Sequence, residues 1–184
     1  MDYRKEYEKW LASPALSEDE RAELKALEGN DKEIKARFYG PLEFGTAGLR
    51  GTMYTGLHNM NRHVIRWATQ GFANVIRAEG TEAMQKGVAV CMDCRNHSAE
   101  FARETACVMA ANGIHVRLFE SLRPTPELSF AVREYGCQAG VNVTASHNPK
   151  EYNGYKVYWA DGAQLPPQHA AAIADELTRI DIFT

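Results

Sequence analysis

The chain has 184 residues, of which 45% are hydrophobic and 24% are charged, and its formal net charge is −3. That composition excludes a disordered chain, and the slightly acidic balance without a basic stripe excludes a nucleic-acid partner. No apolar run is long enough for a membrane helix or a signal peptide, and the cysteine spacing is not that of a disulfide framework, so we expect a cytoplasmic protein without a membrane partner.

The first 39 residues are predicted to form a helical arm. Aromatic residues recur there at near-helical spacing until Pro14 interrupts the run. Ser17 and Glu20 then have the spacing of a capping box, in which the hydroxyl and the carboxylate each accept a backbone N–H at a helix start. We expect residues 1–39 to pack on a main domain of residues 40–184, with a partner-binding helical hairpin as the alternative.

The main domain alternates helical and strand patterns after a glycine-rich stretch that cannot be a regular helix. Such alternation predicts βαβ units, and hence a three-layer α/β/α fold with a mostly parallel sheet. Ligands gather at the carboxyl ends of such strands, so chemistry is expected in the loops that follow them. In chain order, we predict a helix over 64–76, a strand over 88–92, a helix over 101–109, a strand over 114–119, a helix over 125–135, strands over 139–143 and 155–159, and a helix over 166–178, with the candidate loops at 93–98, 121–125 and 144–153.

The loop after the strand 139–143 places a hydroxyl next to an imidazole, at Ser146 and His147. The following Asn148-Pro149 forces a turn. A serine there could be a nucleophile, a phosphate acceptor or a turn residue. The Gly-x-Ser-x-Gly elbow of many hydrolases is missing, and an adjacent histidine is poorly placed as a base, so the residue pattern alone leaves these readings open.

Three segments, in the same order along the chain, resemble the α-D-phosphohexomutases, the phosphoglucomutase/phosphomannomutase family. Residues 144–156 resemble the active-site signature of that family, residues 44–51 resemble its N-terminal loop, and Asp93-Cys94-Arg95 resembles its Asp-x-Arg loop. The Thr-Ala-Gly-Leu-Arg-Gly form of the N-terminal loop, with a charged helical arm ahead of it, resembles the phosphoglucomutase/phosphopentomutase branch.

The resemblance implies a role for four residues. Ser146 would be a phosphoserine that donates its phosphoryl group to a sugar phosphate and recovers it from a bisphosphate intermediate. Lys156 would act as a general acid or base, Arg50 would contact the phosphoserine region or the substrate, and His147 would orient the substrate or move a proton. Cations are needed there because a phosphate adds about −1.5 to −2 charges. The alternatives are a solvated lysine, a surface arginine and a loop-stabilising histidine.

Other residues of these motifs carry expectations of their own. Thr46 and Asn148 would join the arginine and the lysine just named in binding the phosphate or the substrate. Arg95 is expected to brace the active-site loops rather than to touch the substrate. Cys91 and Cys94 have the Cys-x-x-Cys spacing, but Cys91 falls in a predicted buried strand, so we expect no redox role and no zinc site.

The resemblance also implies a magnesium ion and further domains. Mg²⁺ would be held by three aspartates of a second domain, with the phosphate on Ser146 as a further ligand, and a sugar 1,6-bisphosphate would be the intermediate and activator. This chain resembles the first domain and the arm, so we expect an isolated fragment with little mutase activity, whose partners are a sugar phosphate and the remaining domains. The alternatives are a serine hydrolase that uses Ser146 and His147, and a non-catalytic phosphate-binding module.

Overall fold

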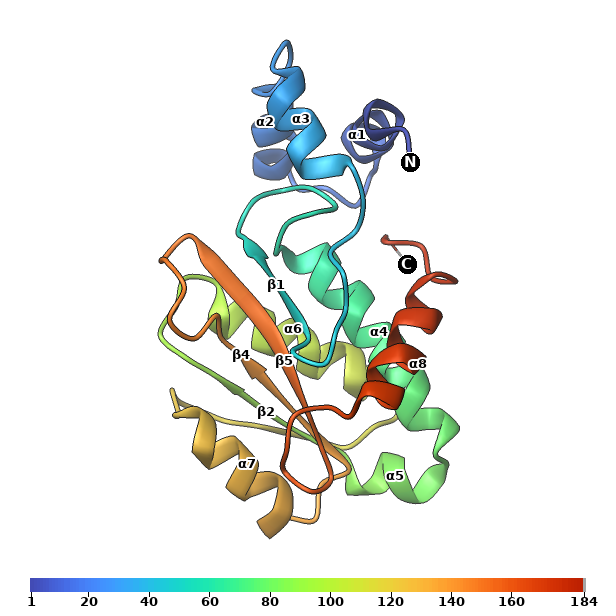
Figure 1. Ribbon diagram of the computed structural model, residues 1–184, viewed down its shortest axis with the longest axis vertical. Coiled ribbons are helices and arrows are strands. Elements are labelled where there is room, and N and C mark those ends of the chain that lie inside the picture. Colours follow the sequence, from blue (N-terminus) through green and yellow to red (C-terminus); the bar gives the residue numbers. More distant parts are fainter. Residues whose placement is uncertain (184) are drawn as a thin grey trace.

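The computed structural model describes residues 1–183, which form eight helices and a five-stranded sheet (Figure 1). Within that range, no helix has the length and apolar character needed to cross a membrane. The helices are α1 (Tyr3–Ala12), α2 (Glu18–Lys25), α3 (Asp31–Phe38), α4 (Arg62–Ala78), α5 (Thr81–Lys86), α6 (Ser98–Ala111), α7 (Thr125–Glu134) and α8 (Pro167–Leu177). The strands are β1 (Leu49–Thr52), β2 (Val88–Met92), β3 (Val116–Leu118), β4 (Ala139–Val143) and β5 (Tyr152–Trp159).

The sheet has the strand order β1-β5-β4-β2-β3 and is mixed rather than mostly parallel. Strand β2 is parallel to both β3 and β4, as expected of βαβ units. Strand β5 is antiparallel to β4, and β1 is antiparallel to β5. The expectation of a mostly parallel sheet was wrong for β5, because the connection 144–151 is too short for a helical crossover and instead turns the chain back on itself, and the prediction did not include β1.

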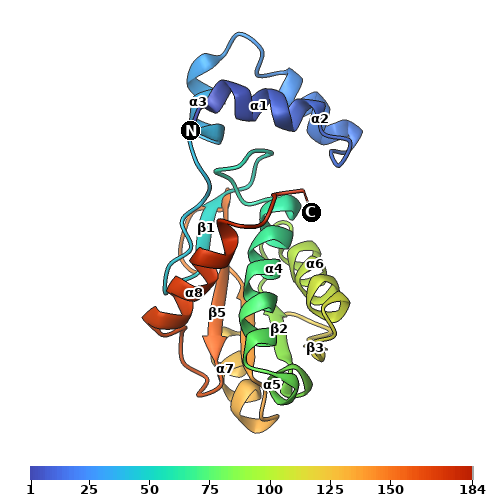
Figure 2. The same ribbon diagram turned by 90° about the vertical axis from the view of Figure 1, so that its right-hand side faces the viewer.

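Helices cover the sheet on both faces, which confirms the α/β class. Figure 2 shows α8, α4 and α6 side by side over one face, where the main apolar core lies. On the other face, α7 packs on β2 and β4, and its Leu128 and Val132 contact a smaller cluster that contains Cys91 and Tyr158. Burial raises the pKa of the Cys91 thiol to about 12, so this side chain is a protonated core residue, as its strand position predicted.

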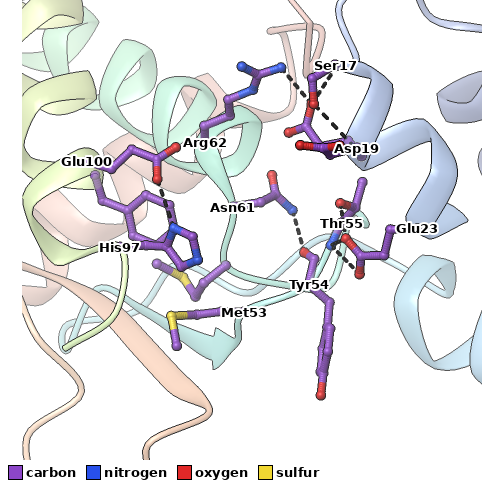
Figure 3. A pocket seen from close by; sticks show the side chains of 13 residues that line it. Ser17, Asp19, Glu23, Met53, Tyr54, Thr55, Asn61, Arg62, His97 and Glu100 are labelled. Atoms are coloured by element: carbon purple, nitrogen blue, oxygen red, sulfur yellow. Dashed lines mark hydrogen bonds and ion pairs between the residues drawn. The ribbon is translucent and has the colours of Figure 1, made fainter.

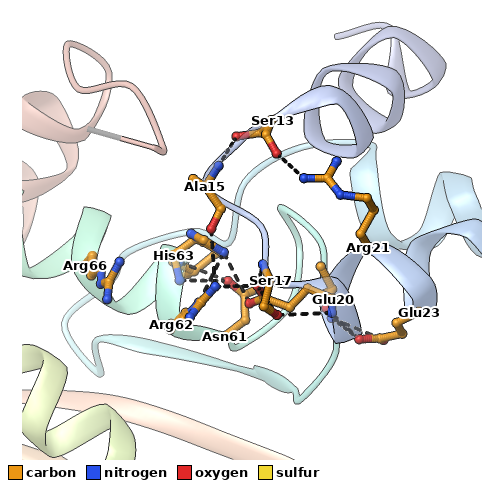
Figure 4. Close-up of polar contacts among 12 residues, drawn as sticks. Ser13, Ala15, Ser17, Glu20, Arg21, Glu23, Asn61, Arg62, His63 and Arg66 are labelled. Carbon is orange, nitrogen blue, oxygen red and sulfur yellow. Dashed lines mark hydrogen bonds and ion pairs between the residues drawn. The ribbon is translucent and has the colours of Figure 1, made fainter.

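The helical arm α1–α3 lies beyond one end of the sheet (Figure 1). Its predicted capping box is present, since the Ser17 hydroxyl accepts from Glu20 N and the Glu20 carboxylate accepts from Ser17 N. Trp10 is fully buried and packs edge-on against Phe38 and against His63 of α4, which joins the arm to the main core. Figure 4 shows the polar part of the same contact, in which Glu20 pairs with Arg62 at 2.6 Å.

Candidate active site

The loop between β4 and β5, residues 144–151, is called the serine loop below. It brings Ser146 to the carboxyl end of β4 with an exposed side chain. Ser146 has a φ of 56°, in the left-handed region that costs a non-glycine residue roughly 1–2 kcal/mol. Such a conformation persists only where surrounding contacts impose it. Here Ser146 N donates to Thr144 Oγ1 at 2.9 Å, and the same hydroxyl donates to Asp93 Oδ2 at 2.6 Å.

Asp93 connects the serine loop to the loop that follows β2. Its backbone N–H donates to Val143 O, the last carbonyl of β4. Its Oδ1 accepts from Ser98 Oγ at 2.8 Å and from Arg95 N at 3.0 Å, while Oδ2 accepts from Thr144. Oδ1 therefore fixes the turn that contains Asp93, and Oδ2 joins that turn to the serine loop, about fifty residues further along the chain.

Arg95 reaches from the same turn into the serine loop. Its guanidinium donates to backbone carbonyls of that loop and of the first residue of β5, with distances of 2.6–3.0 Å. The expectation that Arg95 braces the active-site loops is confirmed by these contacts. Asn153 adds a second connection, because its side-chain amide donates to Asn96 O and Ser98 Oγ at 3.0 Å each.

A cavity of about 420 Å³ lies where these two loops meet, and Ser146 is part of its wall. Cationic and amide groups share that wall, which suits a phosphate. Two of them, Lys150 and Asn96, were missed by the sequence analysis. Lys150 directly follows the Asn148-Pro149 turn, so the search for cations near a phosphorylated serine could have found it. The lining residues are Asp93, Cys94, Arg95, Asn96, Ser146, Asn148 and Lys150.

His147 and Asn148 lie beside the serine but make different contacts. His147 Nδ1 is 3.5 Å from Ser146 Oγ, at the outer limit of a hydrogen bond. The Asn148 side-chain amide donates to Ala145 O at 2.8 Å and so stabilises the turn. An adjacent imidazole at this distance is poorly placed to activate the serine hydroxyl as a nucleophile.

Arg50 and Lys156 share one face of the sheet, the face on which α7 packs. Arg50 pairs with Gly154 in the register of β1 and β5, and Lys156 lies two residues further along β5. Diagonal neighbours of this kind are about 7–8 Å apart. Arg50 is exposed and Lys156 is half-buried. The strand register thus places these two cations close together on this face, and neither is among the residues that line the Ser146 cavity.

The glycine-rich turn before β1 packs directly on β5. A Cβ on Gly48 would lie 1.8 Å from Tyr155 O, and the φ of Gly48 is +75°, so only glycine fits this close approach of two backbones. A backbone bridge joins Gly45 to Gly48, and Thr46 lies exposed between them. The same turn contacts β5 at Tyr155 and Lys156. Thr46 is therefore near Lys156 rather than in the cavity that Ser146 lines.

A buried amide lies beside Lys156 and was also missed. Asn142 of β4 is opposite Lys156 in the antiparallel register and is 1% exposed. Its amide N–H donates to Thr125 Oγ1 at 2.8 Å, but its Oδ1 has no hydrogen-bond partner among residues 1–183. No sequence signal marks Asn142, because an isolated asparagine in a strand usually indicates only a polar edge.

Comparison with known proteins assigns the family. The model described as phosphoglucomutase/phosphomannomutase, alpha/beta/alpha domain I, matches residues 41–182. The chain belongs to the phosphoglucomutase/phosphomannomutase family. This match covers the mixed sheet, the serine loop and the glycine-rich turn, so the resemblance of the three sequence motifs is confirmed.

Several relatives of this phosphohexomutase domain are close in sequence. The phosphopentomutase of Homo sapiens is 41% identical over 156 residues, which cover 82% of this chain and 26% of that protein. The phosphoglucomutase of Staphylococcus saprophyticus is 38% identical over 151 residues, covering 82% of this chain and 27% of that protein. The chain thus spans about a quarter of the length of the curated relatives it matches.

Solved structures agree with this assignment. A Thermus thermophilus structure described as a phosphomannomutase has a TM-score of 0.67 and 31% identity, and the match covers 75% of this chain and 30% of that one. The open form of the Paramecium phosphoprotein pp63/parafusin has a TM-score of 0.65 and 25% identity, covering 77% of this chain and 26% of that one. The fold of the phosphohexomutase domain is therefore shared with both.

The side chains of residues 1–183 do not form a magnesium site by themselves. In the part of the chain that the structure describes, no three His, Cys, Asp or Glu side chains are grouped closely enough to hold a metal ion. Mg²⁺ prefers an octahedron of oxygen ligands, and both oxygens of Asp93, the carboxylate that lines the Ser146 cavity, already accept hydrogen bonds.

Proposed function

We propose that this chain is the first domain of a longer phosphohexomutase, in which Ser146 carries the phosphoryl group. The observation that carries the proposal is the exposed Ser146, held in a left-handed conformation on a braced loop in this family's domain I. Phosphoryl transfer needs accurate placement of the donor oxygen more than it needs covalent help from other side chains. A hydroxyl fixed at a sheet edge, beside a cavity with cationic walls, supplies that placement.

The proposed reaction moves one phosphoryl group twice. In the first transfer, the bond from phosphorus to Ser146 Oγ breaks, a bond from phosphorus to a sugar hydroxyl oxygen forms, and the hydroxyl proton passes to a base while Oγ takes up a proton. The sugar is then a bisphosphate. In the second transfer, Ser146 Oγ attacks the other phosphate and loses its proton, and the released sugar oxygen is protonated. The phosphate has changed position on the sugar and Ser146 is phosphorylated again.

The neighbouring residues fit distinct roles in this proposal. Lys156 would exchange the proton of the reacting oxygen, because a half-buried amine on a strand is a suitable acid or base. Arg50 would bind the phosphate or the substrate from the same face. His147 would orient the substrate, and Thr46 and Asn148 would add hydrogen bonds to it.

The substrate proposed is a sugar 1-phosphate that is converted into a 6-phosphate, or into a 5-phosphate for a pentose. Both the phosphopentomutase and the phosphoglucomutase relatives support this class, with 41% and 38% identity respectively. Groups that select the sugar would lie outside this chain, as would the carboxylates that hold Mg²⁺ together with the phosphate on Ser146. The 184-residue chain alone is therefore expected to convert glucose 1-phosphate at a negligible rate.

Replacement of the serine tests the proposal. In the longer protein, Ser146→Ala is expected to abolish mutase activity, and mass spectrometry of the unchanged protein is expected to find a phosphate on Ser146 that exchanges with labelled sugar phosphate. The matched control is Thr81→Ala, which removes an exposed hydroxyl of α5 outside the cavity and outside the candidate loops. It is expected to keep full activity.

Other outcomes would support the alternatives. A covalent fluorophosphonate adduct on Ser146 would support a serine hydrolase, although the 3.5 Å contact with the adjacent His147 speaks against it. A phosphate on Ser146 that never exchanges with a sugar phosphate would support a regulatory module.

A further inference from the structure

Four of the five N–H bonds of the Arg95 guanidinium, those of Nη1 and Nη2, donate to backbone carbonyls. Nη1 is 2.9 Å from Pro149 O and 3.0 Å from Tyr152 O, and Nη2 is 2.8 Å from Ser146 O and 2.6 Å from Asn148 O. Nε lies 3.5 Å from Asp93 Oδ2. A guanidinium has five donors and no acceptor, and here both terminal nitrogens are engaged by backbone carbonyls while Nε faces a carboxylate.

The four accepting carbonyls all belong to residues 146–152 and converge on the Arg95 guanidinium. One planar group thereby fixes the carbonyl directions at four points of the turn from Ser146 to Tyr152. The Arg95 side chain is only 12% exposed, whereas the Ser146 side chain faces the solvent. The loop is therefore held from the inside by Arg95 and presents its hydroxyl to the outside.

The backbone of Ser146 is the part of the loop that most needs such a constraint. Its φ of 56° is unfavourable for serine, and its carbonyl is one of the four that Arg95 holds. On its other side, Ser146 N is held by Thr144, which Asp93 holds in turn. Arg95 and Asp93 belong to one turn, since Asp93 Oδ1 accepts from Arg95 N. Both sides of the serine peptide are thus fixed by the loop after β2.

We propose that Arg95 is a positioning residue for phosphoryl transfer, which acts through the backbone of Ser146 and does not touch the substrate. This inference rests on the proposed function of Ser146. The left-handed backbone sets the direction of the Cβ–Oγ bond, and hence the line along which a sugar oxygen must approach the phosphorus. If the guanidinium is removed, the turn relaxes and the phosphorus leaves that line, which slows the transfer without weakening the binding of the sugar.

Lysine cannot replace arginine in this role. An ammonium has three donors that diverge from a single atom, so it cannot reach four carbonyls arranged around a planar fork. Free guanidinium, in contrast, has the same shape and donors as the missing group. It can therefore enter the space that Arg95→Ala leaves and restore part of the constraint, which a general loss of folding would not allow.

The experiment compares Arg95→Ala and Arg95→Lys in the longer protein, assayed with sugar 1-phosphate and its bisphosphate. Both are expected to lower kcat by about 100-fold while KM stays within about threefold, since a small misplacement of reacting groups has an effect of that order. Millimolar guanidinium chloride is expected to raise kcat of Arg95→Ala at least fivefold and to leave Arg95→Lys unchanged. In hydrogen exchange, the amides of residues 146–152 are expected to exchange faster in Arg95→Ala.

The matched control is Arg103→Ala, an exposed arginine of α6 that is not among the residues lining the Ser146 cavity. It is expected to keep kcat, KM and the exchange rates of the serine loop. A rise in KM with kcat unchanged in Arg95→Ala would show that Arg95 binds the substrate, and unchanged kcat would show that it has no positioning role. If Ser146→Ala keeps its activity in the same assay, the proposed function itself is wrong. That result differs from unchanged kcat in Arg95→Ala alone, which contradicts only the positioning role.

Discussion

The serine loop and the junction between the arm and α4 both border the segment after β1, but different forces hold them. Met53 N donates to Glu151 O at the serine loop, and Thr55 donates to Glu23 of the arm, around a hollow of about 290 Å³ (Figure 3). The serine loop is held by hydrogen bonds from Arg95. The junction is held by buried aromatic rings around Trp10.

The two regions are therefore expected to contribute differently to the free energy of unfolding. Polar contacts near the surface contribute little net stability, but they define direction, which a transfer reaction needs. Buried aromatic area contributes several kcal/mol and tolerates small changes in direction. Substitutions in the serine loop are therefore expected to change catalysis and leave the free energy of unfolding nearly unchanged, and substitutions in the junction are expected to do the reverse.

The largest expected effect is that of Lys156→Met on catalysis. Removal of a general acid or base lowers kcat by about 10²–10⁴-fold. The Lys156 amine makes no hydrogen bond or ion pair among the described residues, so the midpoint of thermal unfolding should stay within about 2 °C. The control is Lys86→Met, whose amine pairs with Glu82 on the exposed helix α5. Equal kcat in the two variants would remove Lys156 from the mechanism.

Trp10→Ala is expected to lower stability and to leave catalysis nearly unchanged, the opposite of Lys156→Met. The side chain is fully buried among Phe38, His63 and Phe183, so its truncation should lower the free energy of unfolding by about 3–5 kcal/mol. Urea unfolding followed by circular dichroism measures this. Tyr135→Ala, at an aromatic residue that is 58% exposed, should change stability by less than about 0.5 kcal/mol. If Trp10→Ala is as stable as this control, the arm does not contribute to the main core.

Ser17→Ala tests the polar part of the junction. It removes the hydroxyl that accepts from Glu20 N at 3.3 Å at the start of α2, and loss of such a cap costs about 0.5–2 kcal/mol. Ser17→Asn keeps an acceptor at the N-cap and should recover most of that loss. Chemical denaturation compares the two variants, and an equal loss in both would mean that the cap is not the cause.

The smallest expected effect is a pH dependence of the junction. Burial lowers the pKa of His63 below its ordinary value of 6.5, Arg62 and Arg66 add to this, and the Glu20 carboxylate opposes it. Above pH about 6.5, His63 is neutral in both states, and as the pH falls toward the lowered pKa, the unfolded chain binds a proton first, so stability decreases. His63→Gln should remove this decrease in urea unfolding between pH about 7 and about 5. A variant with the unchanged slope would assign the effect to other groups.

Glu20 is expected to lower the stability of the junction further at lower pH. Burial alone would raise the pKa of its carboxyl, but hydrogen bonds from Ser17 and the charges of His63 and Arg62 outweigh burial, and the pKa is lowered. Its contribution to stability is therefore present above the ordinary value of 4.5 and is lost as the pH falls through the lowered pKa. Both groups make the junction weaker in acid.

Much of this fold could be predicted because local patterns agree with it. The apolar stripe of α4, the buried runs of β2 and β4, and the capping box of α2 each have a period or a spacing that their immediate neighbours determine. Strand β1 and helix α5 were not predicted. Leu49–Thr52 lies in a glycine-rich segment with no alternation, and its strand conformation comes from its pairing with β5.

The motifs around Ser146, together with Arg50 and Asp93-Cys94-Arg95, were visible in the sequence, and so was the family. The tertiary structure alone decided that the sheet is mixed, that Arg50 and Lys156 share a face, and that Arg95 donates four hydrogen bonds to the serine loop and the first residue of β5. These facts depend on strand register and on contacts between segments about fifty residues apart or more. A local pattern specifies the face of its helix or strand on which a side chain lies. It does not specify which distant backbone group that side chain contacts.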